Sequence, residues 1–184
     1  MRRIMVMGGP GNGKTTLART LADRLGLAHI ELDSLFHVTG FGSATDDEFR
    51  AGLVERMAEA PQGWVTCGNY ISMCADLHVR EADTIVWLDQ DRRLVTWRVV
   101  KRTVRRAATR EPLFGNDLRE PWSNFLRWDP EHNIIRWAWV HQPRYKIKLN
   151  RHIARPAWAH LDVHHLRTPH EVDEFLAGVE PVAG

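Results

Sequence analysis

The chain has 184 residues, of which 43% are hydrophobic and 26% charged, and its formal net charge is +2 at pH 7. This length suits one domain with a sizeable core, and so small a net charge does not mark a dedicated nucleic-acid binder. The two cysteines, Cys67 and Cys74, show neither metal-type spacing nor a disulfide framework, and no apolar run approaches the ~18 residues of a membrane span.

The first predicted element is a strand, Ile4-Met5-Val6-Met7, that runs directly into Gly8-Gly9-Pro10-Gly11-Asn12-Gly13-Lys14-Thr15. This second stretch matches the phosphate-loop pattern G-x-x-x-x-G-K-[ST], and helical spacing follows from Thr16. Glycines let consecutive N–H groups point at an anion, and the start of a helix adds the positive end of its dipole. We therefore expect this stretch to bind a nucleotide triphosphate, with Lys14 on the outer phosphates and the Thr15 hydroxyl on Mg²⁺.

Strands and helices alternate along the rest of the chain. A helix from Thr15 ends at Gly26, and a strand over 29–32 delivers Asp33 at its carboxyl end, where open α/β sheets place ligand-binding groups. Thr45-Asp46-Asp47-Glu48 predicts a capping box that opens a helix after a loop-like stretch, 34–44. Further strands are expected over 64–67, 84–88 and 161–164, and further helices over about 71–77, 92–107, 134–139, after Pro143, and 170–177. This alternation predicts a parallel sheet covered on both faces.

The helix predicted from Arg92 is strongly basic, with eight basic residues and no acid as far as Arg110. At 100° per residue, one face carries Arg98, Arg102, Arg105 and Arg106, and the other carries Trp97, Val100, Thr103 and Val104. A solvated helix face is one interpretation. Aligned guanidinium groups also suit an anion with several charges, such as a phosphoryl group in transfer, and a neighbouring phosphate loop favours this second interpretation. The irregular stretch 108–124 that follows is typical of a lid.

Several stretches together resemble the adenylate-kinase-like P-loop kinases and, more narrowly, the small bacterial group called topology modulation proteins. They are G-G-P-G-N-G-K-T-T-L-A, I-E-L-D-S-L-F-H, W-V-T-C-G-N-Y, and A-D-T-I-V-W-L-D followed by W-R-V-V-K-R-T. The resemblance implies a three-layer P-loop fold of one domain over 1–184, with a five-stranded parallel sheet of order 2-3-1-4-5 and a helical lid over about 106–127. It also implies transfer of the γ-phosphate of ATP, with Mg²⁺, to a small acceptor.

The same resemblance implies roles for individual residues. Arg98 looks like the lid-helix arginine that packs on the adenine, and Arg102 looks like the next one, which contacts phosphate. The loop that holds the adenine edge looks like Arg167-Thr168-Pro169. Candidates for further lid arginines on phosphate are Arg136, Arg144 and Arg151, and the segments that flank the acceptor pocket contain Phe36, His37, Phe41, Gly68, Asn69 and Tyr70.

One position departs from the family pattern. The third strand in this group ends in an Asp that orders water around the magnesium, and here the residue is Cys67, a poor ligand for a hard cation. This shifts the metal role toward Asp33, which either binds magnesium through water or positions the acceptor hydroxyl as a base; a helix cap is its structural alternative. Asp89 also follows an apolar strand, and we expect it to cap the next helix.

The hypothesis is therefore an ATP-dependent small-molecule kinase, with Lys14, Asp33, Arg98 and Arg102 as catalytic residues. The alternative is an ATP-dependent nucleic-acid-binding regulator that affects DNA topology, for which the basic helix and eight tryptophans would supply phosphate contacts and base stacking. A regulatory GTPase is disfavoured because the sequence contains no Asn-Lys-x-Asp motif. Since Met1-Arg2-Arg3 leads straight into a core strand, we expect no secretory signal and a cytoplasmic monomer or homodimer without a membrane partner.

Overall fold

The computed structural model describes residues 1–38, 42–109 and 134–180. At its centre lies a five-stranded sheet of order β2-β5-β1-β6-β7, and every neighbouring pair in it is parallel. Its strands are β1 (Arg3–Gly8), β2 (Ala28–Glu31), β5 (Trp64–Cys67), β6 (Thr84–Leu88) and β7 (Asp162–Leu166). Numbered by their succession within this sheet, the strands lie in the order 2-3-1-4-5, so the predicted topology is confirmed.

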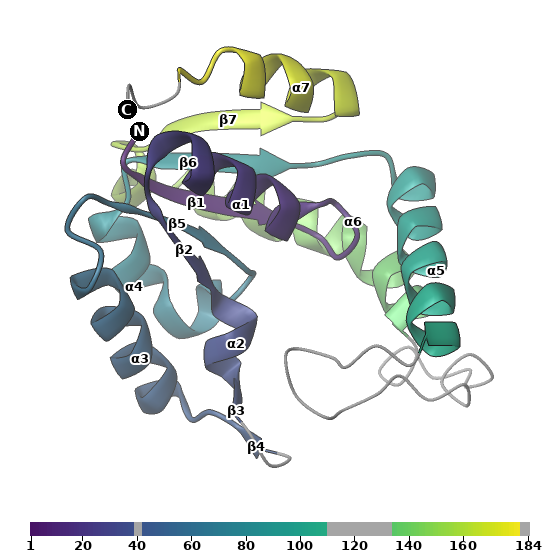
Figure 1. Cartoon of the computed structure of the whole chain (residues 1–184), viewed down its shortest axis with the longest axis horizontal. Coiled ribbons are helices and arrows are strands. Elements are labelled where there is room, and N and C mark those ends of the chain that lie inside the picture. Colours follow the sequence, from purple (N-terminus) through teal and green to yellow (C-terminus); the bar gives the residue numbers. More distant parts are fainter. Residues whose placement is uncertain (39–41, 110–133, 181–184) are drawn as a thin grey trace.

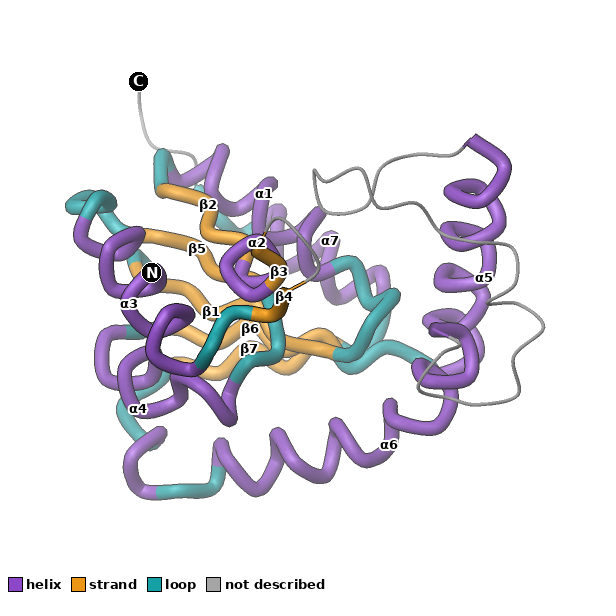
Figure 2. The backbone as a smooth tube through the Cα atoms, turned by 90° about the horizontal axis from the view of Figure 1, so that it is seen from below, coloured by secondary structure: helices purple, strands orange, loops and turns teal. Residues whose placement is uncertain are grey.

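Helices cover both faces of the sheet and make three layers (Figures 1 and 2). One face is covered by α1 (Lys14–Leu25) and α7 (Pro169–Ala177), and the other by α3 (Asp46–Ala58), α4 (Ile71–Glu81) and α6 (Ile134–Ile153). Along β1, Ile4 and Val6 face the first layer while Met5 and Met7 face the second, as the two-residue period of a strand requires. All four side chains are buried, so the sheet has a hydrophobic core on each side.

The remaining elements lie at the ends of the sheet. After β2 come α2 (Leu32–Phe36) and an antiparallel pair, β3 (His37–Val38) and β4 (Gly42–Ser43). Helix α5 (Arg92–Thr109) projects beyond the carboxyl ends of the strands, and α6 runs back along the sheet to a short 3₁₀ helix, Pro156–Trp158 (Figure 1). Across the described residues, no helix combines the length and the apolar character that crossing a membrane would require.

The segment after β2 is more ordered than the sequence indicated. The strand expected over 29–32 ends at Glu31, and residues 34–44, expected to be a loop, contain part of α2 and the β3–β4 pair. Leu32 is buried in the core, and the Ser34 hydroxyl donates to the carbonyl of Glu31 at 2.7 Å. These two contacts turn the chain into a helix directly at the strand end, which places Asp33 on the first turn of α2.

Proline does not divide α6, although helical character was expected separately before and after Pro143. Pro143 has no N–H group to donate to the carbonyl of Trp139 one turn earlier. A guanidinium nitrogen of Arg92 donates to that carbonyl instead, and the Arg92 guanidinium lies 3.7 Å from the centre of the Trp139 ring. The start of α5 thus supplies the hydrogen bond that the proline removes from α6.

The faces of α5 were predicted only in part. Val95, Val99 and Thr103 form the buried stripe of this helix, but Trp97 is 63% exposed and Val104 is 43% exposed. Because α5 projects from the sheet and packs mainly on α6, only a narrow line of its side chains is covered. Trp97 and Val104, which the sequence places on the face opposite the arginines, are therefore exposed rather than part of the buried stripe.

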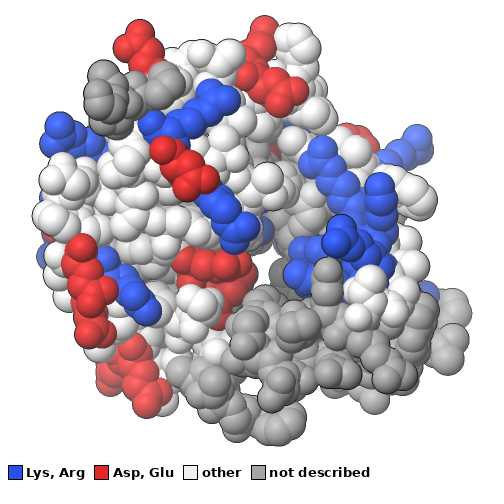
Figure 3. Space-filling view, in the orientation of Figure 1, with Lys and Arg blue, Asp and Glu red and all other residues white. Residues whose placement is uncertain are grey.

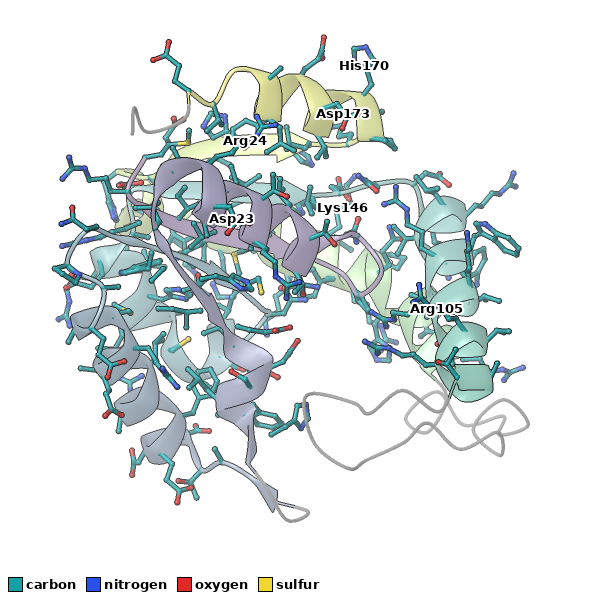
Figure 4. The ribbon with its side chains drawn as sticks, viewed as in Figure 1. Asp23, Arg24, Arg105, Lys146, His170 and Asp173 are labelled. Atoms are coloured by element: carbon teal, nitrogen blue, oxygen red, sulfur yellow. The ribbon has the colours of Figure 1, made fainter. Side chains whose placement is uncertain are left out.

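Asp89 does not cap α5 as expected. The cap is Asp91, whose Oδ1 accepts from the backbone N–H groups of Arg93 at 2.8 Å and Leu94 at 3.4 Å. The side chain of Asp89 is 7% exposed, and its Oδ2 lies 2.6 Å from Nζ of Lys146 on α6 and 2.9 Å from Nε2 of His165 on β7. Figure 4 shows Lys146 near the carboxyl end of the sheet, where this pairing ties α6 to two strands.

Candidate functional site

A cleft of about 630 Å³ opens at the carboxyl ends of β1, β2 and β5. Figure 3 shows blue side chains over α5 and red side chains on the other side of a hollow in this face of the molecule. A second hollow, of about 670 Å³, is more open and lies between α4 and the 3₁₀ helix, away from the phosphate loop. The described residues that line the cleft are Pro10, Gly11, Gly13, Lys14, Thr15, Thr16, Arg19, Glu31, Asp33, Ser34, Cys67, Arg98, Arg102 and Arg106.

The phosphate loop is held in shape by contacts behind it. Gly13, the N-cap residue of α1, has a φ of 87°, and a Cβ atom on Gly11 would lie only 2.7 Å from the carbonyl oxygen of Val95 on α5. The Asn12 side chain is buried, donates to the carbonyl of Gly9 at 3.1 Å and accepts from the backbone N–H of Gln90 at 3.1 Å. Asn12, predicted to bind the nucleotide, therefore uses its side chain to brace the loop.

Lys14 is half-buried at the start of α1, and its ammonium group donates to the carbonyl of Gly9 at 3.1 Å. Burial lowers the pKa of Lys14 from its usual 10.5 to about 8; Asp33 partly offsets this effect and Arg102 adds to it. The ammonium group thus lies in the cleft with incomplete charge compensation. An anion that enters the loop would supply the missing negative charge.

Thr15 faces the ends of two neighbouring strands. Its hydroxyl oxygen lies 3.4 Å from Oε1 of Glu31 on β2 and 3.9 Å from Sγ of Cys67 on β5. Burial first, and then the charge of Glu31, raise the pKa of the Cys67 thiol to about 11, so this thiol is neutral at ordinary pH. Sequence reasoning did not select Glu31, because only the pairing of Glu31 with Cys67 in adjacent strands brings it to Thr15.

The oxygen groups around Thr15 fit a magnesium ion carried by a nucleotide. Mg²⁺ binds through one or two carboxylates, substrate phosphates and water rather than through an all-protein cage. Glu31, Asp33 and the Thr15 hydroxyl all line the cleft. The described residues contain no group of three or more His, Cys, Asp or Glu side chains able to hold a metal ion.

Asp33 forms a polar unit with Tyr70 at the far side of the cleft floor. The Tyr70 hydroxyl donates to Oδ1 of Asp33 at 2.7 Å, and burial followed by the charge of Asp33 raises the pKa of Tyr70. The Tyr70 ring lies between Phe36 and Phe49, with ring centres 5.1 and 5.0 Å away, and His37 lies edge-on to Phe36 at 5.1 Å. The segments predicted to flank an acceptor therefore come together, and Tyr70 orients the carboxylate of Asp33.

Arg98, Arg102 and Arg106 of α5 form one wall of the cleft, whereas Arg105, predicted on the same face and labelled in Figure 4, does not line it. A guanidinium nitrogen of Arg98 donates to Oε1 of Gln90 at 2.5 Å. Gln90 is 3% exposed, and its backbone carbonyl accepts from the side chain of Gln142 on α6 at 2.8 Å. Gln90 thus joins the phosphate loop, α5 and α6, and no motif in the sequence indicated this role.

Other predicted site residues lie outside the lining of this cleft. Asn69 donates to the carbonyl of Gly8 at 2.7 Å, so its side chain braces the entrance to the loop. The predicted adenine loop, Arg167-Thr168-Pro169, forms the N-terminal cap of α7. The Thr168 hydroxyl accepts from the N–H of Glu171 at 3.1 Å, and the Glu171 carboxylate accepts from the N–H of Arg167 at 2.7 Å. Pro169 lies in the first turn of the helix. Arg144 and Arg151 line a separate hollow on α6. The cleft lining does not include four further predicted residues, Gly8, Gly9, Gly68 and Arg136. Two predictions lie outside the described residues: Phe41 and lid residues 110–127.

Comparisons with known proteins identify the fold. No family model matches the chain, and no curated protein matches it. A solved structure of a sugar kinase from Janibacter sp. HTCC2649 is 18% identical, with a TM-score of 0.54, over 96% of this chain and 93% of that one. A protein from Chloroflexus aurantiacus, provisionally described as a kinase, is 15% identical, with a TM-score of 0.53, over 96% of this chain and 95% of that one. The chain therefore has the three-layer α/β fold of these kinase structures.

Proposed function

We propose that this protein is an ATP-dependent phosphotransferase that moves the γ-phosphate of ATP, bound with Mg²⁺, to a hydroxyl or phosphate group of a small acceptor. One observation carries the proposal. The same cleft is lined by residues from three elements: Lys14 and Thr15 of the phosphate loop, Asp33 of α2, and Arg98 and Arg102 of α5. Phosphoryl transfer needs the reacting groups positioned and the charge on the transferred group neutralised, and this arrangement supplies both.

In this proposal the phosphate loop, residues 8–16, holds the phosphates through its backbone N–H groups, which every residue of the loop except Pro10 has, and Lys14 contacts the outer phosphates. The Thr15 hydroxyl, with a carboxylate beside it, holds the magnesium ion, which when bound neutralises part of the phosphate charge. Arg102 and Arg106 contact the transferred phosphoryl group. Arg98 packs on the adenine, and the hydrogen bond to Gln90 fixes the orientation of the Arg98 guanidinium. The adenine edge lies against the Arg167-Thr168-Pro169 loop.

The acceptor enters from the opposite side in this proposal. Phe36, His37 and Tyr70 form its pocket, and Asp33 accepts the proton of the attacking hydroxyl. We place the protein with the adenylate-kinase-like kinases and, within them, with the topology modulation group. The nucleic-acid alternative draws no support from the two similar structures and is not proposed.

The test is ATP turnover with a panel of sugars, nucleosides and nucleotides, chosen first by their protection of the protein against thermal unfolding in the presence of an ATP analogue. We expect ADP release that depends on one acceptor class and falls to background in Lys14→Met. Lys101→Met is the matched control, because Lys101 is an exposed lysine of α5 outside the cleft lining. Wild-type turnover in Lys14→Met, with the control also active, would end the proposal.

A further inference from the structure

The metal side of the cleft lacks an acid at the end of β5. Cys67 occupies this strand end, and its sulfur lies 3.9 Å from the Thr15 hydroxyl. A thiol sulfur is a soft ligand, whereas Mg²⁺ and the water that it binds prefer oxygen. The β5 residue nearest Thr15 therefore has no oxygen atom in its side chain that could bind a magnesium ion or its water.

The neighbouring strand supplies a carboxylate at the same place. Glu31 ends β2 and pairs with Cys67 in the parallel ladder, so the two side chains leave the sheet edge side by side. The longer side chain of Glu31 brings Oε1 to 3.4 Å from the Thr15 hydroxyl oxygen, and Glu31 lines the cleft together with Lys14.

Among the residues that the structure describes, the Glu31 carboxylate forms no ion pair. It is half-buried, and within the described residues no lysine, arginine or histidine lies within ion-pair distance of it. A partly buried carboxylate without a cation is costly, so a divalent ion in the cleft would compensate this charge.

The hydrogen bond to Thr15 has a direction that suits a metal ligand. A threonine hydroxyl has one hydrogen and two lone pairs, whereas an ionised carboxylate only accepts. Thr15 therefore donates its hydrogen to Glu31. The Cys67 thiol donates weakly to one lone pair of the hydroxyl at 3.9 Å, and the other lone pair remains for a cation. A residue that orients a metal ligand in this way, or accepts from metal-bound water, strengthens metal binding without contacting the ion.

We propose that Glu31, at the end of β2, is the positioning carboxylate of the magnesium site. It orients the Thr15 hydroxyl and accepts a hydrogen bond from water on the ion. The inference rests on the proposed function, since the magnesium ion arrives with the nucleotide.

The experiment measures binding rather than turnover. A non-hydrolysable ATP analogue is titrated into wild-type protein and Glu31→Gln by calorimetry, in a Mg²⁺ series and in EDTA. Mutation of the partner of a metal ligand lowers metal affinity by about 10-fold to 100-fold, and Glu31→Gln removes the negative charge beside the ion, so we expect a loss of this size in its Mg²⁺ dependence. Its affinity for the analogue in EDTA should equal that of the wild type, because glutamine retains an oxygen that accepts from Thr15.

Two further variants make the result specific. Glu55→Gln removes an exposed carboxylate of α3 far from the cleft and should leave the Mg²⁺ dependence unchanged. Cys67→Asp placed in the Glu31→Gln background restores a carboxylate beside Thr15 and should recover most of the lost Mg²⁺ affinity; Glu31→Gln alone decides the matter if this double variant does not fold.

The possible failures are separable. An unchanged Mg²⁺ dependence in Glu31→Gln, or equal losses of affinity with Mg²⁺ and with EDTA, overturns the role of Glu31 and leaves the proposed function standing. If the wild-type protein binds the analogue neither with Mg²⁺ nor without it, the proposed function falls and this inference falls with it.

Discussion

The phosphate-loop wall of the cleft, residues 8–16, and the arginine wall, Arg98, Arg102 and Arg106, present cations to the same space but are built differently. The phosphate-loop wall is one continuous stretch whose glycines and helix start act through the local backbone. The arginine wall stands on α5, which is positioned by Gln90, by α6 and by the close approach of Val95 to Gly11. The shape of a loop can thus be set by its own sequence, whereas the groups placed opposite it depend on the packing of distant helices.

The largest expected effect tests whether the arginine wall takes part in chemistry. Arg102→Ala should lower kcat by about 10²-fold to 10³-fold while changing the affinity for the ATP analogue much less, because charge on the transferred group peaks in the transition state. Steady-state kinetics and calorimetry measure the two quantities. Arg93→Ala is the control, since Arg93 is an exposed arginine of α5 outside the cleft lining. If Arg93→Ala lowered kcat and kcat/KM as much as Arg102→Ala does, the effect of Arg102 would come from the overall positive charge of α5 rather than from contact with the transferred group.

The next effect sharpens the description of the phosphate-loop wall. The pKa of Lys14 is lowered to about 8 in the free protein, so the lysine loses its charge as the pH rises through 8. Affinity for the ATP analogue should be constant from about pH 7 to 8 and then fall by up to about tenfold per pH unit, because the phosphates favour the charged lysine. Calorimetry across pH 7 to 9.5 measures it, and a fall of the same size in Lys14→Met would show that another group is responsible.

The same lowered pKa has a consequence for stability, with a definite sign. Between pH 8 and 10.5 the unfolded chain keeps a proton on Lys14 that the folded protein has released, so stability from this group rises with pH in that window. At neutral pH the buried charge costs stability, and Lys14→Met should raise the free energy of unfolding of the ligand-free protein by about 1 kcal/mol, after allowance for screening of a half-buried group. Urea denaturation at pH 7 tests this, and a destabilised variant would contradict it.

The smallest effect tests the connection between the two walls. Gln90→Leu keeps the backbone bonds of residue 90 to Asn12 and Gln142 but removes the oxygen that accepts from Arg98. Loss of one such hydrogen bond costs about 1 kcal/mol, so kcat/KM should fall by about fivefold with little change in the melting temperature. Gln62→Leu, on an exposed turn, is the control. Unaltered kinetics would mean that Arg98 reaches its position without Gln90.

Sequence reasoning located the strands of the sheet and most helix ends because these depend on neighbouring residues. The capping box at Thr45, the left-handed Gly26 after α1 and the buried run Thr84–Leu88 are all visible in a short window and are confirmed. The predictions were wrong where the partner of a residue lies far away in the sequence. Pro143 lies within one helix because Arg92 bonds to Trp139, and Asp89 pairs with Lys146 and His165 rather than capping α5.

The candidate site divides in the same way. The phosphate loop, Lys14, Thr15 and Asp33 are identified by pattern, since a loop between a strand and a helix and a residue at a strand end have local signatures. Glu31 and Gln90 have no such signature. Glu31 reaches Thr15 only because β2 lies beside β5 in the sheet, and Gln90 joins three segments only because α5 and α6 pack over the end of β6. Backbone propensities act between neighbours in the chain, whereas side-chain contacts depend on which elements the folded sheet brings together.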